Sequence, residues 1–362
     1  MKVRCVDATP FRIPFRHPFV IAGVSVQARA GILVEVHDDD GHVGLGEASP
    51  DPRAGPEVLR EAMDALSRAA QMLRAIDPKQ LDTTLEQLEA VPPGIARAGL
   101  EMACCDLVAR SAAVRLAELW RCRVPGRVPV NAVIDTPDPC AAATAARACV
   151  AEGFRCIKLK IAPGDVGREV ARLAAVRDAV GPEIRLRIDA NAIWTPSEAI
   201  DAISQLAVHG VEYVEQPVAT LAALAQVRRA VDTPIAADEC VTGANAVECL
   251  AETGAADLVI VKPTLIGVRT ARAVIHRAHT CSLGVVVTSA LDTSIGIAAA
   301  VHLAATLPDP IRPCGLATAS LLAGDLTGET LVPHGGWLHV PPHAGLGVRL
   351  DEAAVQRWRH RL

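Results

Sequence analysis

Eight short apolar segments recur at a nearly constant interval from residue 128 onward. The segments between them are rich in alanine and place apolar residues three and four positions apart, which is typical of amphipathic helices. Eight repeats of a strand followed by a helix predict an α/β fold, and specifically a parallel (β/α)8 TIM barrel. The predicted strands are VPVNAVI from 128, CIKLKI from 156, IRLRIDAN from 184, VEYVEQP from 211, PIAADE from 234, LVIVKP from 258, GVVVTSA from 284 and PIRPCGL from 310.

Residues 1–122 lack this alternation. Two alternating apolar segments are joined by Asp38-Asp39-Asp40-Gly41, a hairpin signal, and three helical segments follow. We therefore expect an α+β capping domain at 1–122, a barrel at 123–328 and a C-terminal segment at 329–362 that returns to the capping domain. A doubly wound sheet is the less favoured alternative, because no glycine-rich phosphate-binding turn follows the first barrel strand.

Side chains at the C-terminal ends of barrel strands face the active site in this fold. Lysines end the second and sixth predicted strands, and carboxylates end the three strands between them. The spacings of 26 residues from Asp189 to Glu215 and 23 residues from Glu215 to Asp238 are one repeat each, as adjacent strands require. The strand-end set is Lys158, Lys160, Asp189, Asn191, Glu215, Asp238, Glu239 and Lys262.

Three carboxylates at one barrel mouth would repel one another in a low-dielectric site unless a cation lay between them. Oxygen ligands without His or Cys suit Mg²⁺. Each acid taken alone could instead cap the helix that follows it, but three successive strands disfavour that interpretation. The sequence therefore predicts Mg²⁺ held by Asp189, Glu215 and Asp238.

Lysines beside a metal ion indicate abstraction of a proton alpha to a carboxylate, with Mg²⁺ stabilising the enediolate. Lys158 and Lys160 share one strand face because alternate residues point the same way. A solvated edge strand would explain that spacing equally well. Given the carboxylates, we expect Lys160 to be the base, Lys158 to stabilise negative charge, and Lys262 to be a second base or an electrostatic partner.

These motifs resemble the enolase superfamily, and within it the subgroup similar to muconate-lactonizing enzyme. The resemblance covers essentially the whole chain. It implies the same Mg²⁺ ligands, the acid/base pair Lys160 and Lys262, orienting roles for Asn191 and Glu239, a substrate-covering loop near 17–26, and a homo-oligomer. It rests on Lys-x-Lys in IKLKI, Asp-x-Asn in RIDAN, Val-Glu-Gln-Pro at 214–217, Ala-Asp-Glu at 237–239 and Val-Lys-Pro at 261–263, in order on consecutive predicted strands.

The last two predicted strands resemble o-succinylbenzoate synthase, a dehydratase of the menaquinone pathway. In that family a serine-rich turn after strand seven contacts the substrate carboxylate, and Thr288 and Ser289 match it. Dipeptide epimerases usually have Asp-x-Asp on strand eight, where this chain has Cys314-Gly315-Leu316. The stretch GEASPDPRAGPE at 46–57 nevertheless resembles those epimerases.

The resemblance thus implies dehydration to o-succinylbenzoate. Epimerisation of dipeptides or racemisation of N-acylamino acids is the first alternative, and muconate cycloisomerisation is the second. An acid-binding barrel without catalysis is an alternative of another class, and the complete set of carboxylates and lysines disfavours it.

Composition excludes several other classes of function. A chain of 362 residues with 51% hydrophobic and 21% charged residues is typical of a globular protein. The net charge of −5 and the absence of a basic stripe exclude a nucleic-acid or membrane-surface partner, so a small carboxylate substrate is expected. The N-terminal residues lack a signal-peptide core, which predicts a cytoplasmic protein. The 11 dispersed cysteines predict reduced core residues rather than a disulfide framework or zinc site.

Overall fold

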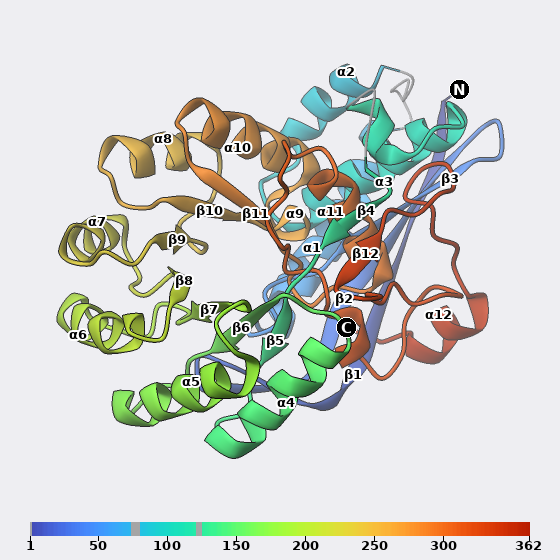
Figure 1. Cartoon of the computed structure of the whole chain (residues 1–362). Helices are drawn as coiled ribbons and strands as arrows, with labels where there is room; N and C mark the ends of the chain where they lie inside the picture. Colours follow the sequence, from blue (N-terminus) through green and yellow to red (C-terminus); the bar gives the residue numbers. More distant parts are fainter. Residues whose placement is uncertain (1, 74–79, 121–124) are drawn as a thin grey trace.

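The computed structural model describes residues 2–73, 80–120 and 125–362. Two hydrophobic cores organise it, one beneath an N-terminal antiparallel sheet and one between a curved parallel sheet and its surrounding helices (Figure 1). The α/β barrel with an N-terminal α+β capping region is confirmed. The predicted boundary between 122 and 123 lies outside the described residues.

The N-terminal sheet has the strand order β1-β2-β3 and is antiparallel throughout. Its closest helix is α3. The two elements pack so tightly that a Cβ on Gly44 or Gly46 would overlap backbone carbonyl oxygens of that helix. The elements are β1 Val3–Ile21, β2 Val24–Asp38, β3 Val43–Ala48, α1 Pro56–Leu73, α2 Leu81–Gln87, η1 Leu88–Ala90, α3 Ile95–Ser111 and η2 Leu116–Leu119.

The barrel sheet contains seven parallel strands in sequential order, β5 to β11. Its strands are β5 Ala132–Ile134, β6 Cys156–Lys160, β7 Arg185–Asp189, β8 Val211–Glu215, β9 Ile235–Ala237, β10 Leu258–Val261 and β11 Gly284–Val287. Helices surround it outside the curve (Figure 1). They are α4 Pro139–Ala151, α5 Val166–Val180, α6 Pro196–Ala207, α7 Leu221–Ala230, α8 Ala244–Glu252, α9 Pro263–Ile266, α10 Val268–Thr280 and α11 Ser294–Ala304.

The prediction of an eighth barrel strand from residue 310 is wrong. The segment from 310 makes only isolated bridges, Val130 with Cys314 and Thr288 with Gly315, and forms no strand. Proline lacks the amide hydrogen that a ladder needs, and the segment contains Pro310 and Pro313. The two bridges still join the first and seventh strands, so the ring closes and the doubly wound alternative is wrong.

β6 lies between β5 and β7, so the interpretation of IKLKI as a solvated edge strand is also wrong. Ile157 and Leu159 belong to the core under the helices, and Lys158 on the other face is buried inside the ring. The alternation of side chains therefore places the two lysines inside the barrel.

The C-terminal segment contacts both parts of the molecule. β12 Trp337–His339 pairs with β4 Arg127–Pro129 near the start of the barrel. The short helix η3, Ala319–Leu321, comes just before the C-terminal segment in the chain. α12 Glu352–Trp358 lies beside the N-terminal sheet (Figure 1), and the His360 amide donates to the Pro10 carbonyl.

Candidate active site

Charged side chains gather at the C-terminal ends of five adjacent barrel strands. β6 carries two lysines, β7 and β8 end in Asp189 and Glu215, and Asp238 and Lys262 directly follow β9 and β10. Lys160 is the register partner of Asp189, and Asp189 is the partner of Glu215. Parallel strands in this register hold the side chains at one level, so the structure brings together the set selected from the sequence.

Each carboxylate in this cluster is paired with a lysine. Lys158 Nζ donates to Asp189 Oδ2 at 3.1 Å and to the two Glu215 oxygens at 3.0 and 3.1 Å. Lys262 donates to Asp238 Oδ2 in a short hydrogen bond. All three acids are less than 9% exposed, so the ammonium groups neutralise charges that water does not reach.

Burial and mutual repulsion separate the acidities of these carboxyl groups. Burial, together with the charges of Asp189 and Asp238, raises the pKa of Glu215 to about 8. Burial also acts to raise the pKa of Asp189, but Lys158 and Lys160 outweigh it and hold that pKa well below its usual range. Negative charge is therefore crowded around Glu215 in the centre of the row.

Burial acts in the opposite direction on the lysines. It favours the neutral amine, but Asp189 and Glu215 outweigh it and raise the pKa of Lys158. Asp238 and Glu215 likewise raise the pKa of Lys262 above its ordinary value. Both groups carry positive charge in this arrangement.

Asn191 and Glu239 extend the cluster toward the pocket opening. Lys160 Nζ donates to Asp189 Oδ2 at 2.6 Å and to Asn191 Oδ1 at 2.8 Å. The Asn191 amide group in turn donates to Glu239 Oε1 at 3.3 Å. Asn191 has a φ of 44°, in the left-handed region that Asn tolerates better than most residues. In this backbone conformation its side-chain amide oxygen points toward Lys160.

Gln216 is a site residue that the sequence analysis did not select. Its φ is 38°, and its Oε1 accepts from the Asp238 amide at 2.8 Å and the Cys240 amide at 3.4 Å. It therefore fixes the turn that presents Asp238. Its place in Val-Glu-Gln-Pro was visible, but its contact with the next strand was not.

A pocket opens above these charges between the barrel and the N-terminal domain. Phe19 and Ile21 line it from the end of the β1–β2 hairpin, where a loop was expected near 17–26. Asp51 and Arg53 line it from the stretch after β3. Burial acts to raise the pKa of Asp51, but hydrogen bonds from Arg53 lower it to about 2, so this wall carries a charged pair.

Thr288 and Ser289 follow β11 and line the same pocket. Thr288 Oγ1 is buried without a hydrogen-bond partner among the described residues. Ser289 Oγ instead lies 2.6 Å from Thr318 Oγ1. A Cβ on Gly315 would lie 2.8 Å from the Thr288 side chain, so glycine is needed for this close approach. Thr288 therefore offers an unused hydroxyl to the pocket.

A buried polar network joins the N-terminal domain to the turn after β11. Arg29 on β2 pairs with Asp292 at 3.1 Å, and both side chains are fully buried. Asp292 also accepts from the Ala290 amide, while Glu47 on β3 accepts from the Thr293 amide and hydroxyl. These bonds hold the pocket-lining turn against the capping sheet.

The carboxylate row fits Mg²⁺ by chemistry and position. Its donors are all oxygen, the type that Mg²⁺ prefers. Burial, and then the charges of the neighbouring carboxylates, raise the pKa of its central member Glu215, and a divalent cation would relieve that repulsion. Asp189, Glu215 and Asp238 would hold the ion. Their oxygens are not all within 4.8 Å of one another, and lysine ammonium groups are paired with them.

A capped parallel barrel with carboxylates set between lysines at its strand ends is typical of enzymes that act on small acids. Residues 5–120 match the mandelate racemase / muconate lactonizing enzyme N-terminal domain, and residues 141–354 match the enolase C-terminal domain-like family. The chain belongs to the enolase superfamily, in the group that includes muconate-lactonizing enzyme, as its motifs predicted.

Relatives of this chain are lyases and epimerases, so it is an enzyme of one of these kinds. An o-succinylbenzoate synthase of Thermobifida fusca is 41% identical over 257 residues, 70% of this chain and 80% of that protein. A hydrophobic dipeptide epimerase of Enterococcus faecalis is 31% identical over 359 residues, 96% of this chain and 99% of that protein.

Structural similarity extends over nearly the whole chain. The crystal structure of a dipeptide epimerase from Enterococcus faecalis V583, complexed with Mg and the dipeptide L-Leu-L-Tyr, has a TM-score of 0.90 at 28% identity. The match covers 96% of this chain and 99% of that one. No helix in the described ranges is long and apolar enough to cross a membrane.

Proposed function

We propose that this enzyme removes a proton alpha to a carboxylate in a small acid, with Mg²⁺ as cofactor. One observation carries the proposal: Lys160 and Lys262 stand on the second and sixth barrel positions and line one pocket, and three carboxylates stand at the ends of the intervening strands. Two ammonium groups on opposite sides of an acidic row suit a carbon acid held between them.

Mg²⁺ bound by Asp189, Glu215 and Asp238 would supply positive charge to the oxygens of the substrate carboxylate. Lys160 is the proposed base, because its amine would face the pocket beside that carboxylate. Lys158 remains charged and stabilises negative charge in the transition state. Asn191 and Glu239 are positioning residues that orient Lys160.

Dehydration to o-succinylbenzoate is the proposed reaction. Lys160 accepts the alpha proton and returns it to the hydroxyl group on the adjacent carbon, which leaves as water, and a carbon–carbon double bond forms. Lys262 supplies positive charge on the opposite face. The 41% identity to an o-succinylbenzoate synthase supports this reaction. So do Cys314 and Leu316, which stand where dipeptide epimerases usually carry the two aspartates of Asp-x-Asp.

Epimerisation of a dipeptide or an N-acylamino acid is the second candidate. Asp51 places a carboxylate on the pocket wall, where it could meet a substrate ammonium group. The similarity to a dipeptide epimerase also covers 96% of this chain. In that reaction Lys160 and Lys262 would both exchange protons with the same carbon. Muconate cycloisomerisation is the third candidate.

The testing experiment follows purified protein with Mg²⁺ in D₂O by absorbance and by ¹H NMR. The substrates are the hydroxylated cyclohexadiene carboxylate precursor, a panel of L,L-dipeptides and a panel of N-succinyl amino acids. Loss of the precursor without deuterium entry into the others supports the synthase. Exchange at a dipeptide alpha carbon with inert precursor supports the epimerase.

Absence of both reactions and of Mg²⁺ binding would contradict the proposal and favour an acid-binding barrel without catalysis. The partner we propose is therefore a small carboxylate, with no role for nucleic acid or membrane, in a cytoplasmic enzyme that forms a homo-oligomer.

A further inference from the structure

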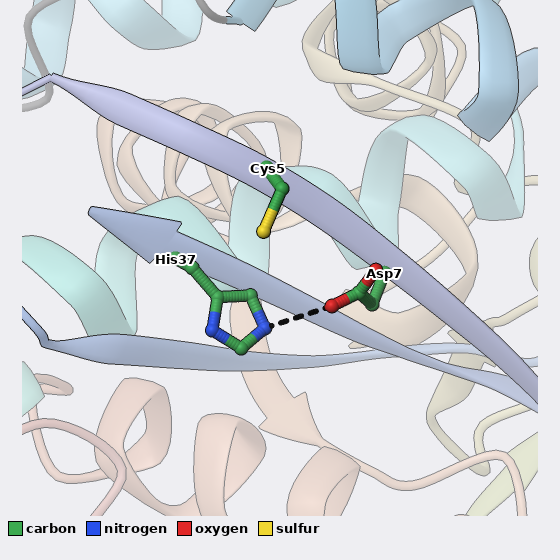
Figure 2. Close-up of side chains that lie close together, drawn as sticks. All are labelled: Cys5, Asp7 and His37. Atoms are coloured by element: carbon green, nitrogen blue, oxygen red, sulfur yellow. Dashed lines mark ion pairs between the residues drawn. The ribbon is translucent and has the colours of Figure 1, made fainter. Parts of the chain in front are cut away.

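A second group of metal-ligand types lies on the N-terminal sheet, away from the catalytic pocket. In the described part of the chain, Cys5, Asp7 and His37 form the group of three whose donor atoms all lie within 4.8 Å of one another. Figure 2 shows the three side chains reaching toward one another from two neighbouring strands. None of them lines the pocket above the barrel.

Strand register explains why these residues meet. Cys5 on β1 is the direct antiparallel partner of His37 on β2. Asp7 lies two residues further along β1, so it points to the same face as Cys5. His37 Nε2 lies 3.1 Å from Asp7 Oδ2 (Figure 2). A paired ladder, rather than a loop, therefore presets the positions of all three donors.

The donors are one thiol sulfur, one imidazole nitrogen and one carboxylate oxygen. Zn²⁺ binds all three types, in a tetrahedron whose ligand atoms lie roughly 3–4 Å apart. The observed separations need only small side-chain adjustments to reach that geometry. Cys5 is not in a disulfide, so its sulfur is free to bind after the thiol loses a proton to solvent.

Nearby acids add negative charge to this face. Glu35 lies two residues before His37, opposite Asp7 in the register. Glu352 on α12 also interacts electrostatically with Glu35. Three carboxylates thus face one imidazole across the outer side of the sheet, and a divalent cation would balance them.

We propose that Cys5, Asp7 and His37 form a binding site for Zn²⁺ that is separate from the catalytic centre. The Asp7 side chain is 61% exposed and that of His37 is 20% exposed, so an ion can enter from solvent and keep water as a fourth ligand. A bound ion would join β1 to β2 and stabilise the sheet that caps the barrel. The dispersed spacing of the cysteines hides this site in the sequence.

The test uses untagged, full-length protein with saturating Mg²⁺, so that the carboxylate row is not available to the probe metals. Zn²⁺ affinity is measured by competition with a chromophoric chelator, and Co²⁺ is added as a spectroscopic probe of thiolate ligation. We expect one tight Zn²⁺ site, a thiolate-to-Co²⁺ charge-transfer band, and proton release that makes binding stronger at higher pH.

The variants are Cys5→Ser and His37→Gln, with Cys140→Ser as the matched control because Cys140 is an exposed cysteine outside the group. Either ligand variant should weaken Zn²⁺ binding by more than roughly a hundredfold, since loss of an outer-shell partner alone costs 10–100-fold. Cys5→Ser should also abolish the Co²⁺ band. Circular dichroism and alpha-proton exchange with Mg²⁺ should remain as in the wild type.

Three results would overturn the proposal. They are the absence of a tight Zn²⁺ site in the wild type, a Co²⁺ band that survives in Cys5→Ser, and equal loss of binding in Cys140→Ser. None of these results bears on the proposed alpha-proton chemistry, which is measured separately.

Discussion

Lys158 and Lys160 donate hydrogen bonds to the same atom, the Oδ2 oxygen of Asp189, over 3.1 and 2.6 Å. Lys158 directs its remaining donors to both Glu215 oxygens. Lys160 has one further side-chain partner, Asn191, and its side chain is 16% exposed against 8% for Lys158. The two lysines, which are neighbours on one strand face, thus differ: Lys158 bonds only to carboxylates, and Lys160 also bonds to an amide and is the more exposed of the two.

Lys160→Gln should strongly reduce alpha-proton exchange while the fold persists, because the base is lost but the strand is not. We expect a fall of roughly 10²–10⁴-fold in kcat, the usual contribution of a general base. Deuterium incorporation followed by NMR measures it. Lys2→Gln, a change of an exposed lysine, is the control, and exchange at the wild-type rate in Lys160→Gln would remove this lysine from the mechanism.

Lys262→Arg separates the lyase from the epimerase, because arginine keeps the positive charge but is not a base at neutral pH. If Lys262 supplies only charge, dehydration of the precursor should persist at a reduced rate. If Lys262 is the second base, conversion between stereoisomers should stop while exchange by Lys160 continues on one isomer. Circular dichroism of the substrate measures conversion, and NMR measures exchange in the same sample.

Mg²⁺ should raise the melting temperature of the wild type and not that of Glu215→Gln. Binding at a hundred times the Kd stabilises the folded state by about 2.7 kcal/mol, and removing the central carboxylate removes that gain. Asp51→Asn is the matched control, because it changes a pocket carboxylate outside the row. Chelation should abolish activity and Mg²⁺ should restore it; equal Mg²⁺ stabilisation in Glu215→Gln would contradict the ligand assignment.

The barrel and its strand-end charges were predictable because each repeat carries its own signal. A buried parallel strand shows as a short apolar run, and the last residues of each run then fall at the barrel mouth. Asp189, Glu215 and Asp238 were selected in this way, and the structure places all three at one end of the sheet.

One strand was missed and another was wrongly predicted, both for reasons that involve proline. β1 contains Pro10, Pro14 and Pro18, which argue against a strand in sequence, but β1 is an edge strand and its outer side needs no amide donors. At the eighth barrel position a strand was predicted despite its prolines, and the structure has only two isolated bridges there.

Contacts between distant segments were not predictable from one sequence. Asp51 and Arg53 face the pocket only because the capping sheet docks beside the barrel. Cys5 meets His37 only because of the register of β1 on β2. Neither relation leaves a local pattern of hydrophobicity or spacing.

Thr288→Val should weaken substrate binding with little loss of stability, because the hydroxyl is buried without a protein partner in the described structure. A hydrogen bond to a charged carboxylate contributes roughly 1.5–3 kcal/mol, so KM should rise about 10- to 150-fold. Thr288→Ser keeps the hydroxyl and is the control. A KM unchanged in Thr288→Val, measured beside its urea midpoint, would exclude Thr288 from substrate contact.

His302 on α11 should make the protein sensitive to mild acid. Its Nδ1 accepts from the Ala117 amide at 3.3 Å and its Nε2 lies 3.2 Å from the Leu346 carbonyl, an arrangement that needs the neutral ring. Burial lowers the pKa of His302 from 6.5 to about 4. The unfolded chain therefore binds a proton between these values and the folded protein does not, so stability is complete above pH 6.5 and declines as pH falls toward 4.

The loss attributable to His302 should reach about 3 kcal/mol at pH 4, from 1.36 kcal/mol per pKa unit. Urea unfolding between pH 4 and 8 measures it. His302→Gln should flatten the slope of stability against pH between 4 and 6.5, although it lowers stability at pH 8 by disturbing two buried hydrogen bonds. His360→Gln, which changes an exposed histidine, should leave the slope unchanged. An identical slope in His302→Gln and the wild type would show that other groups govern acid unfolding.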